Sequence, residues 1–196
     1  MTSTPPASRR VNNTDRRQQL LDGALLGIRQ HGSHVSMDQL AQACGITKPV
    51  LYRYFTDRDG LISAIADDFV AQLTDQLAVV LDIELGGEVQ VPRAATTYLN
   101  YVTAHREIYE FLIHNITTGT HQSLVFRVAD QIGVGLAAHR QLLGVDDSPS
   151  AMWAVALVGM FAAATDWWLA SSADSLNVES VVDSITTLVR MERLDF

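Results

Sequence analysis

Hydroxyl and cationic side chains gather in one short stretch of the sequence, directly after the dipeptide Gly45-Ile46. The stretch carries Thr47, Lys48, Tyr52, Arg53, Tyr54 and Arg58. Lys48 is the only lysine of the chain. Ammonium, guanidinium and hydroxyl groups donate hydrogen bonds to phosphate oxygens, and a lysine also donates to guanine O6 or N7. Side chains of these types at this spacing therefore favour contact with an anionic partner such as nucleic acid.

Two short helices joined by a glycine turn are predicted to position these side chains. Ser36 and Gln39 have the spacing of a capping box, which opens the first helix. Gly45 supplies the left-handed backbone needed where that helix ends. In the second helix, Leu51 and Phe55 lie four residues apart and are predicted to anchor it to the core. The pattern is that of a helix-turn-helix over residues 36–55.

The beginning of the second helix is the end that a recognition helix directs at base edges. Thr47 is predicted to cap it, and Pro49 is tolerated in its first turn because a proline there loses no hydrogen bond. Lys48 would donate to guanine, while Pro49 and Val50 offer apolar contact to a thymine methyl group. Tyr52 and Tyr54 suit phosphate oxygens equally with half-buried packing, and the sequence leaves both roles open.

The charge distribution supports this interpretation in spite of an acidic total. The chain has 196 residues and a net charge of -8. Residues 1–60 hold 8 basic and 5 acidic residues, a balance of +3, so the remainder carries -11. A basic head on an acidic body is expected when one end of a protein meets phosphate.

Composition places the protein in a reducing compartment. Cys44 is the only cysteine, so no internal disulfide can form. The N-terminal residues 1–13 lack an apolar core and do not read as a secretory signal. We therefore predict a cytoplasmic protein with a flexible arm over residues 1–13.

Helical periodicity extends through almost the whole chain, which predicts an all-α fold of about nine helices. Thr14 is predicted to cap the first helix, Gly32 to end it, and Thr56 with Asp59 to open the fourth. Further helices are predicted near 90–104, 106–117, 121–143, 149–171 and 178–192. The predicted domains are a helix-turn-helix DNA-binding domain over 14–60 and a ligand-binding and dimerisation domain over 61–196.

Residues 151–170 form an apolar stretch about as long as a bilayer is thick. Asp166 interrupts it, and basic flanking residues are absent. A helix that is apolar all round also occurs inside globular proteins. We predict a buried helix and no membrane partner.

At residues 17–66 the chain resembles the TetR family of bacterial transcriptional regulators. The segment VSMDQLAQACGITKPVLYRYFTDRDGLISAI follows the helix-turn-helix signature of that family almost position for position. Asp38 departs from relatives that carry a basic residue there, so no base contact is assigned to it. By this resemblance one group of residues would contact phosphates, namely Thr47, Tyr52, Tyr54 and Arg58, and a second group would face bases, namely Lys48, Pro49 and Val50. The full set assigned to DNA adds Arg16, Arg17, Ser36 and Arg53.

The resemblance implies an all-α homodimer that binds a palindromic DNA operator as a repressor and releases it when a small molecule binds. The apolar stripe over residues 178–189 and the helix over 151–170 would then form the dimer interface. Pattern alone leaves internal packing open for both, and the resemblance favours the dimer. No cofactor is predicted.

Aromatic and polar side chains embedded in the C-terminal helices mark a candidate pocket for a hydrophobic ligand. Each of them suits core packing as well. The candidates are Tyr101, His105, Tyr109, Phe111, His114, Phe126, Trp153, Met160, Asp166 and Trp167. Glu107, Glu110 and His114 favour a solvated face over a metal site, because no second histidine or cysteine accompanies them.

Two other function classes fit the sequence less well. An enzyme would need a nucleophile elbow, a phosphate loop or paired carboxylates, and none is found. A dimerising interaction module would not need the set Lys48, Tyr52 and Tyr54.

Overall fold

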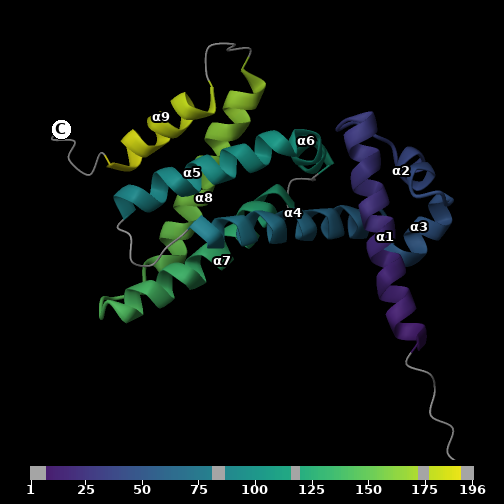
Figure 1. Cartoon of the computed structure of the whole chain (residues 1–196), viewed down its shortest axis with the longest axis horizontal. Helices are drawn as coiled ribbons and strands as arrows, with labels where there is room; N and C mark the ends of the chain where they lie inside the picture. Colours follow the sequence, from purple (N-terminus) through teal and green to yellow (C-terminus); the bar gives the residue numbers. More distant parts are fainter. Residues whose placement is uncertain (1–7, 81–86, 116–119, 172–176, 191–196) are drawn as a thin grey trace, which may run out of the picture. The chain divides into compact units, whose positions relative to one another are not determined.

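Nine helices make up the part of the chain that the computed structural model describes, namely residues 8–80, 87–115, 120–171 and 177–190 (Figure 1). These residues contain no strand, which confirms the predicted all-α class. The helices are α1 (Ser8–His31), α2 (Met37–Ala43), α3 (Lys48–Phe55), α4 (Arg58–Val80), α5 (Gly87–Ala104), α6 (Arg106–Asn115), α7 (Thr120–Leu142), α8 (Ser150–Ala170) and α9 (Val178–Arg190).

The first helix begins earlier than the sequence predicted. α1 starts at Ser8, so Thr14 lies inside the helix and does not cap it. Residues 8–13 of the predicted arm are therefore helical, while residues 1–7 lie outside the described residues. Neither glycine nor proline separates Ser8 from the apolar stripe. Extending an existing helix costs far less free energy than nucleating one. The part of α1 that is packed against the core is therefore extended toward the N-terminus through residues 8–13.

The chain divides into two compact units. The first comprises Met1–Asp68 and Arg106–Thr117, and the second comprises Phe69–His105 and Thr118–Phe196. This division differs from a boundary after residue 60, because α4 contributes residues to both units and α6 belongs to the first.

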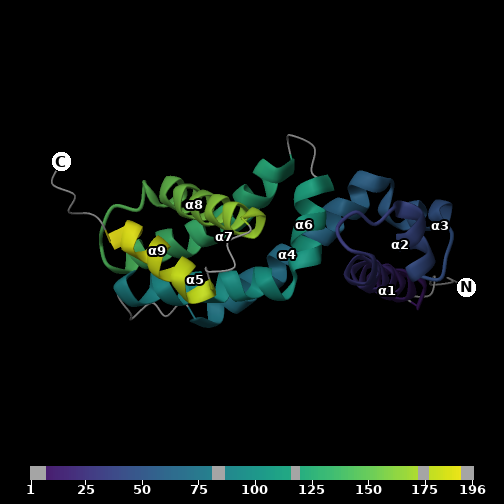
Figure 2. The ribbon, with the colours of Figure 1, turned by 90° about the horizontal axis from the view of Figure 1, so that it is seen from above.

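The first unit packs α1 against α2 and α6, and α2 against α3 (Figure 2). Its core contains side chains from all of these helices, including Ile28, Leu40, Leu51 and Phe111, each fully buried. Burying a side chain of this size stabilises a fold by about 1.5–3 kcal/mol. Leu51 therefore fixes the position of α3, as the sequence predicted.

The turn between α2 and α3 follows the predicted chemistry. Ser36 and Gln39 form the capping box, in which the Gln39 amide donates to Ser36 Oγ at 3.3 Å. Gly45 adopts φ +68. The amides of Gly45 and Ile46 donate to the carbonyls of Gln42 and Ala41, and this paired arrangement closes the C-terminus of a helix.

The turn between α3 and α4 differs from the prediction that Thr56 opens the fourth helix. Thr56 has φ 71 and ψ -57, and the Asp57 amide donates to the Phe55 carbonyl at 2.8 Å. These values describe a γ-turn of the rarer, positive-φ kind. A capping residue needs extended backbone, so the capping position passes to Asp57, whose Oδ1 accepts from the Gly60 amide at 2.8 Å.

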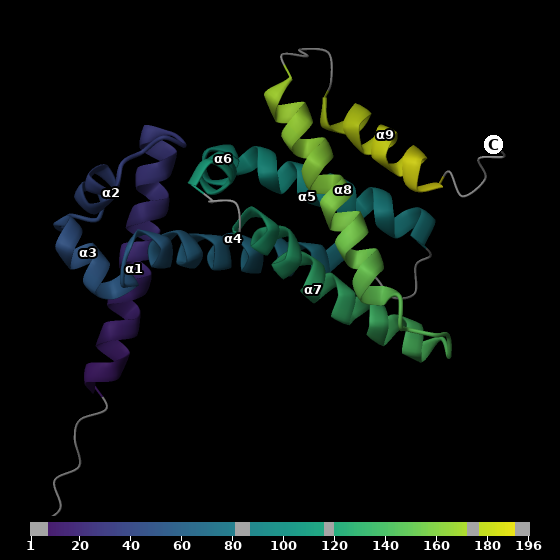
Figure 3. The same ribbon diagram turned by 180° about the vertical axis from the view of Figure 1, so that it is seen from behind.

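The second unit contains two helix pairs, α7 with α8 and α5 with α9 (Figure 3). Ala95 and Leu99 of α5 are buried against Val181, Val182 and Ile185 of α9. The predicted stripe of the last helix thus packs inside its own chain on one side. Asn177 caps α9 as predicted, because the Ser180 amide donates to its Oδ1 at 2.9 Å.

The prediction of a buried helix over residues 151–170 is wrong for the single chain. By length and composition alone, α8 is long and apolar enough to cross a membrane. Within an apolar stretch of 18 residues of this helix, 22% is buried inside the chain. One side of the helix packs inside the chain, and its buried residues are Ser150, Ala154, Val158, Ala162 and Thr165. Since α8 is apolar all round, packing on one side leaves an apolar face exposed, with Met152 69% and Trp167 65% accessible.

Candidate functional site

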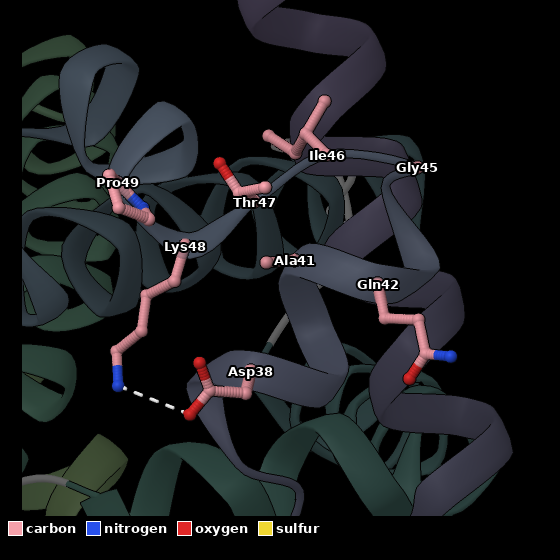
Figure 4. A pocket seen from close by; sticks show the side chains of 8 residues that line it. All are labelled: Asp38, Ala41, Gln42, Gly45, Ile46, Thr47, Lys48 and Pro49. Carbon is pink, nitrogen blue, oxygen red and sulfur yellow. Dashed lines mark hydrogen bonds and ion pairs between the residues drawn. The ribbon is translucent and has the colours of Figure 1, made fainter.

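The beginning of α3 presents its polar groups around a surface hollow (Figure 4). Thr47 occupies the capping position, yet its hydroxyl makes no capping hydrogen bond. The prediction of a Thr47 side-chain cap is therefore wrong, and the hydroxyl is available to another acceptor. Pro49 is exposed and Lys48 half-buried beside it. The lining of the hollow is completed by Asp38, Ala41, Gln42, Gly45 and Ile46.

An ion pair joins the two helices at this hollow. Lys48 Nζ lies 3.3 Å from Asp38 Oδ2, and Figure 4 shows the lysine side chain reaching across to the start of α2. The two residues lie ten positions apart, so no helical periodicity predicts their contact. In the sequence, Asp38 stood out only as a departure from relatives, and nothing there paired it with Lys48.

The rest of α3 offers polar groups along its surface. Only Leu51 and Phe55 are buried, while Tyr52 and Tyr54 are half-buried and Arg53 is exposed. The Arg53 guanidinium lies 5.6 Å from the centre of the Tyr54 ring. The half-burial of both tyrosines is compatible with packing and with phosphate contact, so their assignment to DNA stays a prediction.

The N-terminal half of α1 adds cations next to α3. Arg17 lies over the Phe55 ring, with its guanidinium carbon 4.8 Å from the ring centre. A second hollow is lined by Asn13, Thr14, Arg17, Arg53 and Tyr54. The structure thus brings together Arg17, Arg53 and Tyr54, which the sequence assigned to DNA from separate helices. Asn13 and Thr14 were missed, because they read as arm and cap in the sequence.

Arg16, Ser36 and Arg58, also assigned to DNA, have partners within the first unit. Arg16 donates to Gln19 at 3.1 Å, and Ser36 serves the capping box. Arg58 donates to Asn115 of α6. All three side chains are exposed, so these contacts leave a phosphate contact open, and the assignments stay predictions.

The lone cysteine supports the packing of α1 on α2. Cys44 Sγ donates to the Leu20 carbonyl at 3.2 Å. Burial raises the pKa of the thiol, while the nearby Arg16 lowers it to a smaller extent. The shift favours the neutral thiol over the nucleophilic thiolate.

The candidate ligand-binding residues do not form one cluster. Tyr109, Phe111 and His114 belong to the first unit, where the first two are buried and His114 lies 4.9 Å from the His34 ring. The others belong to the second unit, and they are Tyr101, His105, Phe126, Trp153, Met160, Asp166 and Trp167.

Within the second unit, Tyr101 is buried and donates from its hydroxyl to the Phe69 carbonyl at 3.2 Å. The centre of the His105 ring lies 4.5 Å from that of the Tyr101 ring, with the two planes tilted by 56°. Trp153 lies under the Arg140 guanidinium at 4.5 Å. These contacts are those of packing, and the ligand assignments stay predictions. Among the residues described, no three histidine, cysteine or acidic side chains could hold a metal ion.

Two family models match the sequence. The model described as "Bacterial regulatory proteins, tetR family" matches residues 20–65, which include α2, α3 and the ion pair between them. The model described as "Tetracyclin repressor-like, C-terminal domain" matches residues 76–194, more than half of the chain. The chain belongs to the TetR family. TetR-family proteins are DNA-binding transcriptional regulators, and the matched residues 20–65 contain the helix-turn-helix of this chain.

Individual relatives agree with the TetR assignment. The chain is 29% identical over 181 residues to an uncharacterized HTH-type transcriptional regulator of Mycobacterium tuberculosis, covering 90% of this chain and 76% of that protein. It is 27% identical over 156 residues to the HTH-type transcriptional regulator BetI of Escherichia coli, covering 63% of this chain and 77% of BetI.

Solved structures share the TetR fold. A TetR-like transcriptional regulator from Rhodococcus sp. RHA1 is 27% identical with a TM-score of 0.59, covering 95% of this chain and 96% of that one. AibR, solved in complex with isovaleryl coenzyme A and operator DNA, is 20% identical with a TM-score of 0.56 and coverages of 88% and 97%.

Proposed function

We propose that this TetR-family protein is a cytoplasmic repressor that binds a palindromic operator as a homodimer and leaves it when a small hydrophobic ligand binds. The observation that carries the DNA part is the exposure of α3. Two side chains, Leu51 and Phe55, hold this helix on the core. Of its polar and proline residues, Thr47, Pro49 and Arg53 are exposed, and the others are half-buried and not enclosed.

The homodimer is proposed from the exposed face of α8. Met152, Ala156, Ala163, Trp167 and Ala170 are exposed and lie on the side of α8 opposite its buried residues. A contiguous apolar face of this kind marks a protein interface. A second copy supplies the same face, and two reading helices related by a two-fold axis match a palindrome.

The ligand is proposed to be a small, mainly hydrophobic molecule held by aromatic side chains of the second unit. Tyr101, His105, Trp153 and Asp166 remain the favoured contacts. AibR, of the same fold, was crystallised with isovaleryl coenzyme A, which supports a search among acyl compounds. Such a ligand releases DNA only if it binds the DNA-incompetent state more tightly than the DNA-bound one.

Selection of bound duplexes from a random pool tests the proposal. We expect recovery of one palindromic sequence with half-sites about one helical turn apart, since a two-fold dimer places its reading helices at that spacing. Binding should weaken steeply as salt rises, because neutralising phosphates releases counterions. Recovery of unrelated sequences, or binding indifferent to salt, would contradict the proposal.

Variants of α3 separate phosphate contacts from base contacts. Tyr52→Phe combined with Tyr54→Phe should weaken binding to all duplexes by a similar factor, because phosphate contacts carry no sequence information. Lys48→Ala should also change which half-site the pool returns. An unchanged half-site with Lys48→Ala would show that Lys48 does not face bases.

A further inference from the structure

We propose that Asp38 is a specificity-determining residue, which competes with DNA phosphates for the only lysine of the chain and so weakens binding to DNA that is not the operator. The inference rests on the proposed operator binding. Three observations carry it: the ion pair between Asp38 and Lys48, the access of solvent to both side chains, and the place of Lys48 at the beginning of α3 with Asp38 beside it on α2.

The accessibility of the ion pair indicates that the Asp38 carboxylate competes with DNA for Lys48 and contributes little to the stability of the fold. The Lys48 side chain is 39% accessible and that of Asp38 is 74% accessible. An exposed ion pair contributes little to stability, since water screens it and two long side chains lose freedom. Either partner is therefore free to exchange the other for a group on DNA.

On random DNA the exchange brings little gain. A phosphate oxygen and the Asp38 carboxylate are both singly charged oxygen acceptors, so Lys48 exchanges one anion for another. The carboxylate left behind then faces the phosphates and repels them. The contribution of Lys48 to sequence-independent binding is thus reduced by Asp38.

On the operator the same pair has a use. Lys48 donates to guanine O6 or N7, and a nearby carboxylate can accept from the amino group of cytosine. A guanine-cytosine pair under the beginning of α3 therefore satisfies both side chains, whereas phosphate satisfies only one. Asp38 therefore raises the ratio of the affinity for the operator to the affinity for random DNA, because it weakens the binding of random DNA.

The test compares four proteins on the selected operator and on a random duplex of equal length, across a range of salt concentrations. They are wild type, Asp38→Asn, Lys48→Met and the double variant. Asp38→Asn should bind the random duplex about three- to tenfold more tightly, with a salt slope steeper by about 1. Its affinity for the operator should change by less than about twofold, since the loss of the charged acceptor for the cytosine amino group offsets the relief of repulsion.

The controls isolate the competition for Lys48. Asp22→Asn removes the same charge from an exposed position of α1 and should leave the ratio of the two affinities unchanged. In the Lys48→Met background, Asp38→Asn should have no more effect than Asp22→Asn. Circular dichroism confirms that each variant is folded.

Two outcomes would overturn the inference. In the first, Asp38→Asn strengthens binding to both duplexes equally. In the second, its effect persists without Lys48. Failure of wild type to select any operator is a different result, which would contradict the proposed function itself.

Discussion

At the scale of single residues, the surface at α3 contains polar groups that contribute little to the local structure around them. Thr47 takes the backbone of a capping residue, while its hydroxyl makes no capping bond. Lys48 and Asp38 form a pair too exposed to stabilise the fold appreciably. Polar groups that contribute little to stability at this position are available for recognition.

Cys44 provides a residue-scale prediction. Because burial raises the pKa of its thiol, the folded protein holds less thiolate than the unfolded chain at the same pH. Alkylation at pH 8 should therefore be slower in the folded protein than in denaturant, and the rate should climb as pH rises. Labelling with a fluorescent maleimide, quenched at a series of times, measures both rates.

The same shift has a consequence for stability. A raised pKa in the folded state means that the neutral thiol favours folding. The contribution of Cys44 to the free energy of unfolding is therefore full at pH values below the pKa of the thiol in the unfolded chain. It is lost as pH rises through the pKa of the thiol in the folded protein. Cys44→Ser keeps a donor near the Leu20 carbonyl and removes this alkaline dependence. Equal alkylation rates in folded and denatured protein would contradict the assignment.

At the scale of elements, the connection from α3 to α4 is a tight turn with an unusual backbone conformation. Thr56 is the only non-glycine residue with positive φ among the residues described. Backbone of this kind is strained in a β-branched residue. The hydrogen bond from the Gly60 amide to Asp57 Oδ1 stabilises the turn. The turn also brings the backbone of Gly60 so near to the Phe55 carbonyl that a Cβ would not fit.

Gly60→Ala tests that turn. A Cβ at residue 60 would overlap the carbonyl oxygen of Phe55, and this backbone atom has little room to move. We expect a loss of about 1–3 kcal/mol in the free energy of unfolding. Thermal denaturation followed by circular dichroism measures it.

Gly135→Ala is the matched control within a helix. A Cβ there would meet no atom within 4 Å, so the substitution should be neutral or stabilising by about 0.5–1 kcal/mol. Equal stability of Gly60→Ala and wild type would show that the α3–α4 turn tolerates a side chain.

At the scale of the whole molecule, the single chain leaves apolar surface that the proposed dimer would cover. α8 buries one side and exposes the other, on which a Cβ at Gly159 would meet nothing within 4 Å. Small residues along this face permit a second helix to approach closely. An isologous pair of α8 helices is consistent with both observations.

Ala163→Glu tests the dimer. Each copy would bring a charge to the same interface, which should cost about 3 kcal/mol or more, or roughly a hundredfold in the dimer dissociation constant. Sedimentation should then report the 21.5 kDa chain in place of a particle of twice that mass. Val134→Glu, at a position 73% exposed on α7, should leave the dimer intact. A dimer unaffected by Ala163→Glu would place the interface elsewhere.

The sequence by itself determined the helical class, the helix-turn-helix and the capping box that opens it. Capping boxes, glycine turns and the 3.6-residue period depend on neighbours within a few positions, so they are readable without a fold. The extent of α1 was not readable in this way, because tertiary anchoring extends a helix through residues that have no apolar pattern of their own.

Only the tertiary structure decided which distant groups meet. The contacts of Lys48 with Asp38 and of Arg58 with Asn115 join different helices, and no sequence period encodes them. The exposure of α8 was decided in the same way, since an apolar helix reads alike whether one side or every side is covered. Packing chooses among arrangements that the same local pattern allows.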